Sequence, residues 1–449
     1  MMKKSVILIT LCGIVLRFVV SFGILGSCPL VGDGPTYSQQ AQQLVDGTLG
    51  FTYFPPGTAI CLAPFYALFG VSGTVDHLFG VVVSSCLLAS IVWLCIVVFG
   101  WDKRTVVGTC LAALIPHDIM EATQVSSLPL VAFFLTMATC LAVNVWKQWS
   151  WTLWLFCSAF LAAAVITRPA SVSIVVVLAA VGLLMVFRKR MPLTRYIAAA
   201  AATAIVVAVT VVPWCMHNQA RAQGWTIATN TEWNFFLANN PLTPDYKTGH
   251  FGQRGIPELD SATQAYLLRF VPSGDPSNCT YAERVTMKDE AVRYILAEPL
   301  RTLYRVSNRA RSYWGVDYNM TRMVQDDYSL PTASVLTIML SEAGMVFLLL
   351  VLAISAPFLI RRPIGEFGVF FSLIVVAGML PYLAAFAQPR FHTPAIPLVL
   401  VPAAAALTFM VDQPRFAWHT LRSRPLWWAL MAALIALQLE LTYHHVVLK

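Results

Sequence analysis

Charged side chains are scarce in this chain: aspartate, glutamate, lysine and arginine together make up 12% of its 449 residues. A soluble globular domain carries roughly 25%, so the composition excludes an ordinary cytosolic enzyme, a disordered protein and a nucleic-acid-binding protein. Hydrophobic residues make up 58%, and the mean hydropathy is +0.68. Because several apolar runs are long enough to cross a bilayer, the sequence predicts an all-α polytopic membrane protein whose partners include the lipid bilayer and no nucleic acid.

A cysteine framework is also absent. The ten cysteines are scattered, with no C-x-x-C motif and no Cys/His cluster. Most of them stand in apolar runs, where cysteine is usually a small core residue. The sequence therefore requires no cofactor; a divalent metal ion is possible, but no residue pattern supports one.

Eleven apolar segments are the expected membrane-spanning helices. The first resembles a signal peptide, but at about twenty residues it is longer than a typical signal core, so we expect an uncleaved span. The segment 105–116 is too short for roughly 30 Å of hydrocarbon and must borrow flanking residues or be buried among its neighbours. The expected spans are Ser5–Leu25, Asp76–Phe99, Thr105–Pro116, Ala122–Val145, Trp151–Ile166, Ser171–Phe187, Tyr196–Trp214, Ser334–Ile360, Phe367–Ala387, Thr393–Val411 and Leu426–Val447.

The net charge of +8 is informative by position along the chain. When the N-terminus is placed inside, basic residues concentrate in every inside loop, whereas the short outside connections carry acids or a lone arginine. The inside residues are Lys3, Lys4, Lys103, Arg104, Lys147, Arg188, Lys189, Arg190, Arg195, Arg361, Arg362, Arg415, Arg422 and Arg424. The sequence thus predicts a plasma (inner) membrane protein with a cytoplasmic N-terminus and an exoplasmic C-terminus.

Two of the outside segments are long. The first, 26–75, follows the first span, and the second, 217–332, holds most of the polar residues and is about the size of a small domain. We therefore expect three parts. These are a transmembrane module (1–216) that contains the first outer loop, an exoplasmic α-rich cap (217–332) with an interfacial helix, and a second transmembrane module (333–449).

An acidic residue, Asp33, stands between Gly32 and Gly34 directly after the first span. Glycine lets a backbone approach a ligand closely, so a carboxylate in this place is a candidate for chemistry. The alternative is that Asp33 only caps the helix that carries Tyr37 and Ala41. Taken by itself, the residue favours the cap.

Landmarks along the rest of the chain favour a functional site. After Asp33, Tyr37 and the Pro55-Pro56-Gly57 turn, the loop continues as Leu62-Ala63-Pro64-Phe65-Tyr66-Ala67-Leu68-Phe69-Gly70. Later motifs are Thr167-Arg168-Pro169, Thr229-Asn230 with Asn239-Asn240-Pro241, Ala291 with Tyr294-Ile295 and Pro299, and Arg390-Phe391-His392-Thr393-Pro394. In order and spacing, the chain resembles the protein-mannosyltransferase-like membrane glycosyltransferases of the GT-C fold, family 39 type.

That resemblance implies transfer of a sugar from a polyprenyl-phosphate-linked donor to an exoplasmic acceptor glycan, lipid or protein, with Asp33 as the catalytic base. An acceptor hydroxyl is a poor nucleophile, so a carboxylate must take its proton as the bond forms. Attack opposite the phosphate would invert the anomeric configuration, and the departing phosphate needs positive charge. Some members of the fold carry a second acid in this loop, but Asp33 is followed by Gly34 and Pro35.

Two other functions remain open. A transporter or flippase of a lipid-linked sugar would place charges or broken helices at the bilayer midplane, and the sequence has few of either. An oligosaccharide ligase is a second alternative within enzymes, because the size of the donor depends on the shape of the cavity.

Polar residues at other outer span ends are further candidates. Asp118 and Glu121, beside His117, are second-acid candidates that contact a metal, a sugar hydroxyl or the acceptor, unless they only mark the water boundary of a short helix. Arg390 and Arg168 are lone cations and candidates for the donor phosphate, since a guanidinium fork suits that group. The alternative for both is a structural ion pair.

A third set lies in the long outer segment. Arg301, Arg305 and Arg309 recur every four residues and form one stripe of a helix. We expect Arg301 and Arg305 either to bind the donor phosphate or, as most such arginines do, to reach toward lipid headgroups. The predicted substrate-loop residues are Tyr37, Pro55, Pro56, Asn239 and Asn240.

Overall fold

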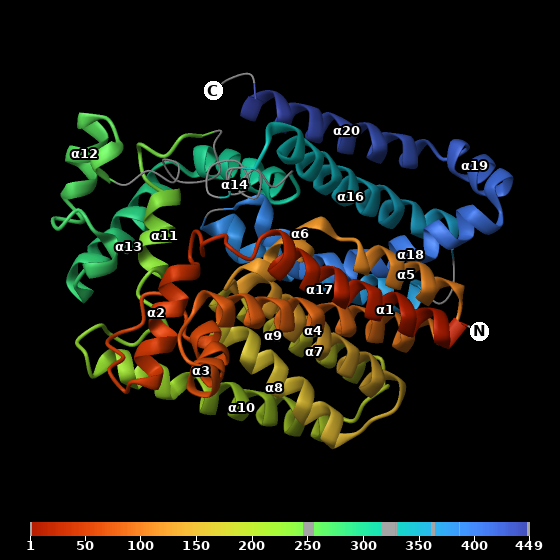
Figure 1. Cartoon of the computed structure of the whole chain (residues 1–449), viewed down its shortest axis with the longest axis horizontal. Helices are drawn as coiled ribbons and strands as arrows, with labels where there is room; N and C mark the ends of the chain where they lie inside the picture. The colour runs from red at the N-terminus through yellow and green to blue at the C-terminus, as the bar shows by residue number, and fades with distance from the viewer. Residues whose placement is uncertain are drawn as a thin grey trace.

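The computed structural model describes residues 2–245, 256–315, 328, 330–360, 364–385 and 387–446. Within these ranges the chain forms helices joined by short connections and contains no β-strand. Long helices run side by side along the length of the molecule, and short helices gather at the end away from the N-terminus (Figure 1). The predicted all-α class is confirmed.

Eight helical segments in the described part of the chain are long enough and apolar enough to cross a bilayer. They are α1 with η1 (Met2–Phe18 and Val19–Ile24), α4 (Gly73–Phe99), α7 (Ser127–Lys147), η3 with α9 (Pro169–Ser171 and Val172–Phe187), α10 (Leu193–Gln219), α16 (Thr332–Leu359), α17 (Ile364–Ala384) and η7 with α18 (Pro389–Ala395 and Ile396–Asp412). Each coincides with an expected span. The chain is therefore an integral multi-pass membrane protein.

The other three expected spans are helices as well, but they do not meet the same length and composition. They are α5 (Lys103–Ala113), α8 (Trp151–Thr167) and α20 (Pro425–Val446), whose apolar part is Pro425–Glu440. At 11 residues α5 is the shortest, and it packs against α1, α4 and α18. The expectation that this short segment is buried among its neighbours is confirmed.

The end of α5 is determined by a buried arginine from another helix. Arg17 of α1 is fully buried, and its guanidinium donates hydrogen bonds to the carbonyl oxygens of Ala112 and Ala113, both at 3.4 Å. Carbonyls in the last turn of a helix have no partner within the helix, and a cation there is favourable. Arg17 Nε also donates to Ser84 Oγ of α4 at 2.8 Å, so one side chain joins three helices.

The remaining helices are short or lie outside the bundle. They are α2 (Gly34–Val45), α3 (Gly57–Phe69), α6 (Pro116–Met120), η2 (Glu121–Thr123), α11 (Thr231–Ala238), η4 (Ile256–Glu258), α12 (Ser261–Leu268), η5 (Pro276–Asn278), α13 (Tyr281–Ala297), α14 (Pro299–Tyr313) and α19 (Pro414–Arg422).

The described helices of the predicted cap (217–332) are α11 to α14. In Figure 1, α11 lies beside α2 of the first outer loop. The backbone joins the two segments: the N–H groups of Thr229 and Asn230 donate to the carbonyl oxygens of Thr52 and Tyr53, at 3.0 and 3.2 Å.

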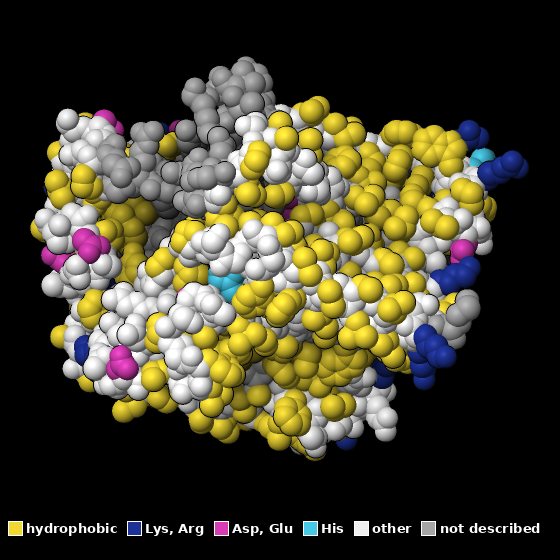
Figure 2. Space-filling view, in the orientation of Figure 1, with side chains coloured by type: hydrophobic (Ala, Val, Ile, Leu, Met, Phe, Trp, Pro, Cys, Tyr) yellow, Lys and Arg dark blue, Asp and Glu magenta, His cyan; other side chains and the backbone are white. Residues whose placement is uncertain are grey.

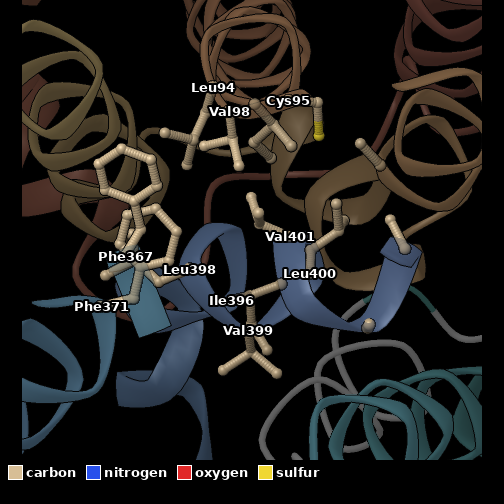
Figure 3. Close-up of a cluster of buried hydrophobic side chains, with 14 of the residues drawn as sticks. Leu94, Cys95, Val98, Phe367, Phe371, Ile396, Leu398, Val399, Leu400 and Val401 are labelled. Atoms are coloured by element: carbon tan, nitrogen blue, oxygen red, sulfur yellow. The ribbon is translucent and has the colours of Figure 1, made fainter. Parts of the chain in front are cut away.

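The main apolar core lies between α4, α17 and α18. In Figure 3, Leu94 and Val98 of α4 face Leu400 and Val401 of α18, with Phe371 of α17 to one side. Leu94 and Leu400 are fully buried. Packing of this kind keeps the site end of the bundle on a rigid frame.

Charge is divided between the two ends of the molecule. On the face shown in Figure 2, most lysine and arginine side chains gather at the end that holds the N-terminus, and the cap lies at the opposite end. Arg361 and Arg362, two of the predicted inside residues, lie outside the described residues. The cytoplasmic position of the N-terminus stays a prediction that this distribution favours.

We call the segment between α5 and α7, which contains α6 and η2, the second outer connection. Its close packing on α4 leads to a first prediction. A Cβ at Gly80 would lie 2.4 Å from the carbonyl oxygen of Ala122, whereas a Cβ at Gly73 of the same helix would meet nothing within 4 Å. We expect Gly80→Ala to destabilise the protein by about 1–3 kcal/mol because backbone must move, measured as a lower melting temperature in detergent. Gly73→Ala is the matched control and should melt no lower than wild type. Equal melting of the two variants would contradict this packing.

Candidate functional site

Asp33 stands at the start of α2, but it does not act as a helix cap through its side chain. Gly32 turns the chain with a φ of +60°, and Asp33 occupies the N-cap position, but its carboxylate accepts no capping hydrogen bond. Instead, Asp33 Oδ2 lies 3.6 Å from Arg390 Nη2, and the Asp33 side chain is 39% exposed. The carboxylate is thus both paired with a cation and accessible.

Arg390 comes from η7, more than 350 residues away along the chain, and the same short segment contacts the rest of the site. Arg390 Nε donates to Gln388 Oε1 at 2.9 Å. The next residue, Phe391, is buried, and its ring lies 4.8 Å from the guanidinium carbon of Arg168. Arg390 and Arg168, two of the four predicted phosphate-binding cations, therefore both contact this short segment.

Arg168 follows the C-terminus of α8. Its guanidinium carbon lies 4.8 Å from the ring of Phe391 and 5.6 Å from that of Tyr382, two rings that stack on each other. The guanidinium hydrogen-bonds the Tyr382 hydroxyl, and its Nη1 donates to Ser127 Oγ at 3.2 Å. Ser127 also hydrogen-bonds Tyr37. A guanidinium has five N–H donors, so one held over aromatic faces and by two hydroxyls still has donors for an anionic ligand.

The close packing of two motifs explains how Arg168 reaches the first outer loop. A Cβ at Gly57, which follows Pro55 and Pro56, would lie 2.3 Å from Oγ1 and 2.6 Å from Cα of Thr167. Pro55 and Pro56 are buried at the N-terminus of α3. The two prolines therefore form part of the wall of the site, and the glycine allows the loop to touch the residue before Arg168.

Tyr37 lies at the centre of these groups. Its side chain is buried, with its ring 5.3 Å from that of Phe54. Burial and the negative charge of Asp33 raise the pKa of Tyr37 to about 12, although Arg168, Ser127 and Arg390 act in the opposite direction. Tyr37 is therefore a neutral hydrogen-bonding group at physiological pH.

The second outer connection lies beside the first outer loop. Gln124 bridges them: its Oε1 accepts from the Val31 N–H at 2.9 Å and its Nε2 donates to the Pro29 carbonyl at 3.2 Å. Asp118 is 3% exposed and lies near Arg17 within the bundle. Burial raises the pKa of the Asp118 carboxyl above its ordinary value, with His117 and Arg17 opposing.

Glu121 and His117 belong to the same connection. Glu121 Oε1 lies 4.0 Å from His117 Nε2, and the Glu121 side chain is 15% exposed. Among the residues that the structure describes, no group of three or more His, Cys, Asp or Glu side chains is arranged to hold a metal ion.

Arg301 and Arg305 are engaged within the cap. Their Nε atoms both donate to Asp245 Oδ1, at 2.7 and 2.8 Å, and Arg305 Nη1 donates to the Asn240 carbonyl at 2.9 Å. Partial burial acts to raise the pKa of Asp245, but the hydrogen bonds from Arg301 and Arg305 bring it below its ordinary value. Arg305 and Arg309 are each 2% exposed, so the expectation that they reach toward lipid headgroups is wrong. Their guanidinium groups instead donate to backbone carbonyls, Arg305 in the cap loop and Arg309 at the ends of α11 and α17.

Asn239 and Asn240 are buried in the same loop. Asn239 Nδ2 donates to the carbonyls of Phe235 and Ala384, both at 2.9 Å. Asn240 Oδ1 accepts the N–H groups of Leu242 and Thr243, at 2.9 and 3.1 Å. These amides organise the cap loop and join it to α17, and their predicted contact with substrate stays a prediction.

A small apolar crevice lies beside Arg168. Its walls come from α7, α9, α14, α17, α18 and the η3 and η7 turns, and Tyr382 and Phe391, the two rings next to Arg168, line it. The other lining residues are Val131, Leu135, Ala170, Ser171, Ile174, Tyr313, Ile374, Val375, Gly378, Pro394, Ala395 and Leu398. A cation thus stands at the edge of an apolar space.

Sequence reasoning missed several residues of this site. Ser127, Tyr382 and Gln388 each hold one of the two arginines, through Ser127 Oγ, the Tyr382 ring and Gln388 Oε1. Each is a single residue at the end of an apolar run and belongs to no motif, so only the spatial arrangement reveals its part.

No protein-family model and no curated protein sequence matches this chain. Solved structures do match it. ArnT from Cupriavidus metallidurans bound to undecaprenyl phosphate is 13% identical with a TM-score of 0.42, and 91% of this chain and 79% of that chain are covered. The apo state of the same protein is 14% identical with a TM-score of 0.40, and 90% of this chain and 78% of that chain are covered. The Archaeoglobus fulgidus oligosaccharyltransferase tethered to an acceptor peptide gives 16% and 0.48, over 92% of this chain and 50% of that one. These scores describe a distant likeness and assign no activity to this chain.

The raised pKa of Tyr37 leads to a second prediction. An unfolded tyrosine titrates near 10 and Tyr37 near 12, so the stability that its neutral form contributes is complete below pH 10 and is lost between pH 10 and 12. We expect the melting temperature of Tyr37→Phe to fall less steeply across this range than that of wild type. The control is Tyr281→Phe, because Tyr281 is 49% exposed on α13; its slope should match wild type. A Tyr37→Phe slope equal to the control would contradict the burial argument.

Proposed function

We propose that the protein is an integral-membrane glycosyltransferase that moves a sugar from a polyprenyl-phosphate donor to an exoplasmic acceptor, with inversion and with Asp33 as general base. The observation that carries the proposal is the pairing of an accessible Asp33 carboxylate with Arg390 at 3.6 Å. Arg168 lies in the same cluster, because its charge affects the pKa of Tyr37 together with the charges of Arg390 and Asp33. The resemblance of the sequence motifs to family 39 glycosyltransferases supports the same assignment.

The cluster contains the groups that the reaction needs. A general base must come within hydrogen-bond distance of the acceptor hydroxyl. The Asp33 side chain is 39% exposed, so an acceptor can approach it. Negative charge develops on the phosphate as the sugar leaves, and guanidinium groups stabilise it there. Arg390 Nη2 and Asp33 Oδ2 form an ion pair at 3.6 Å, which is longer than a hydrogen bond. Nη2 can therefore turn to a phosphate without breaking a hydrogen bond to Asp33.

The apolar crevice supports a lipid-linked donor. A polyprenyl phosphate has one charged end and a long apolar tail, and Arg168 stands beside an apolar space lined by Tyr382 and Phe391. In this proposal the donor enters sideways from the outer leaflet, with its phosphate at Arg168 and Arg390. The N-terminus is cytoplasmic and the site faces the exoplasmic side of the plasma membrane, which the division of charge supports.

The three predicted parts take roles in the same proposal. The module 1–216 supplies Asp33 and Arg168, the cap segment 217–332 covers the site and shapes the choice of acceptor, and the module 333–449 supplies Arg390. Asp118 and Glu121 would serve as a second acid only if a metal takes part, and the reaction as proposed needs none.

The base assignment is tested with Asp33→Asn. We expect purified Asp33→Asn to lose transfer from a panel of labelled polyprenyl-phosphate sugars by about 10² or more, because general base catalysis contributes that much, while its melting temperature and lipid binding persist. Asp46→Asn is the matched control, since Asp46 is an exposed residue at the other end of α2.

Three other outcomes have distinct meanings. Transfer by Asp33→Asn equal to that of Asp46→Asn would remove Asp33 as the base. Loss of wild-type transfer with a chelator would introduce a metal and direct attention to Asp118 and Glu121. A wild-type protein that transfers no sugar but moves a lipid-linked sugar across vesicles, with Asp33→Asn equally active, would establish the flippase alternative.

The phosphate-binding assignment is tested with Arg390. We expect Arg390→Ala to raise the donor KM about tenfold or more, since a hydrogen bond to a charged group contributes about 1.5–3 kcal/mol. The donor KM of Arg390→Lys should lie between those of wild type and Arg390→Ala, because lysine keeps the charge without the guanidinium fork. Arg293→Ala, which removes a cation 74% exposed on α13, should bind the donor as wild type does. A donor KM for Arg390→Ala equal to that of Arg293→Ala would refute the assignment.

A further inference from the structure

The hydroxyl of Thr393 stands where two hydrogen bonds meet. Thr393 belongs to η7, three residues after Arg390, and is 2% exposed. Its Oγ1 lies 2.7 Å from the carbonyl oxygen of Arg390 and 3.0 Å from Nε2 of His117. A hydroxyl has one proton; because the carbonyl of Arg390 can only accept, Thr393 donates to it and accepts from His117 Nε2–H.

His117 is in turn attached to a third part of the molecule. Its backbone N–H donates to Oε2 of Glu342 at 3.0 Å. Glu342 is 1% exposed within α16, and His117 is 5% exposed at the start of α6. A carboxylate at the first turn of a helix is favourable. The contacts therefore run from α16 through the second outer connection to the backbone of Arg390.

The direction of the Arg390 side chain depends on that backbone. The side chain is 26% exposed, and its nearest partners are Gln388 Oε1 at 2.9 Å, in its own segment, and Asp33 at 3.6 Å. On the other side of the turn, His392 Nδ1 donates to the Tyr313 carbonyl at 2.9 Å. Thr393 and His392 thus hold the turn from opposite sides, and Thr393 holds the carbonyl of Arg390 itself.

We infer that Thr393, oriented by His117 and Glu342, is a positioning residue that aims Arg390 at the donor phosphate beside Asp33. The inference rests on the proposed function, since it assigns Arg390 to the donor. A positioning residue should alter the binding of the donor more than the chemical step, and its effect should depend on the presence of Arg390.

The test uses the purified full-length protein and the variants Thr393→Val and Thr393→Ala, which both remove the hydroxyl. We expect each to raise the donor KM about tenfold with a smaller change in kcat, and Thr393→Ser to restore the wild-type KM. Thr408→Val is the matched control: Thr408 is a buried threonine of α18 whose hydroxyl bonds to its own helix at Ala404, 2.8 Å away. In the Arg390→Ala background, Thr393→Val should add no further loss.

The same variants are compared for binding of undecaprenyl phosphate alone, by native mass spectrometry. A donor KM for Thr393→Val equal to that of Thr408→Val, or a full additional loss in the Arg390→Ala background, would overturn the inference and leave the proposed function intact. If wild type transfers no sugar but binds the lipid phosphate, the proposed function fails, and weaker binding by Thr393→Val but not by Thr408→Val still supports the positioning role. Absence of lipid phosphate binding by wild type would overturn both.

Discussion

A polar group buried among apolar helices must be paired, because leaving it without a partner costs several kilocalories per mole. This requirement organises the site end of the protein. Arg17, fully buried in a membrane-spanning helix, satisfies the last carbonyls of α5 and the hydroxyl of Ser84. Ser84 then donates to the carbonyl of Asp118 at 2.6 Å. One arginine therefore determines both where a short helix stops and where the second outer connection sits.

The cap obeys the same rule with a different result. Arg305 and Arg309 look from the sequence like interfacial cations, yet both are buried and donate to backbone carbonyls, Arg305 in the cap loop and Arg309 at the ends of α11 and α17. By contrast, Arg390 and Arg168 have aromatic rings, side-chain hydroxyls, the Gln388 amide oxygen and a loose ion pair as neighbours. The arginines of the cap serve the fold, and those at the end of the bundle remain able to meet a phosphate. The residue type is the same in the two groups; the difference lies in which protein acceptors surround each guanidinium.

The site depends on distant segments brought together at one turn. Asp33 comes from the first outer loop, Arg168 from the end of α8 and Arg390 from η7. The turn from Arg390 to Thr393 contacts Asp33, Arg168, the cap and the second outer connection in succession. In the proposed function, such an arrangement would couple the donor-binding cation to the base and to the cap that would cover the acceptor. It also explains why a short motif near the end of the chain matters to a loop near its beginning.

Hydrophobic periodicity and length determined the all-helical class and the eight long spans, because a helix that crosses hydrocarbon needs about twenty apolar residues in sequence. Asp33, Arg168 and Arg390 could be selected from the sequence, since a lone charge at the end of an apolar run is conspicuous. The sequence did not reveal Ser127, Tyr382 or Thr393, or that Arg305 is buried and not interfacial. These roles depend on which carbonyl, hydroxyl or ring lies within about 3–5 Å of a side chain. Contacts between residues far apart along the chain are decided only when the helices pack, and that is why only the tertiary structure shows which arginines are enclosed by backbone carbonyls and which lie beside Asp33.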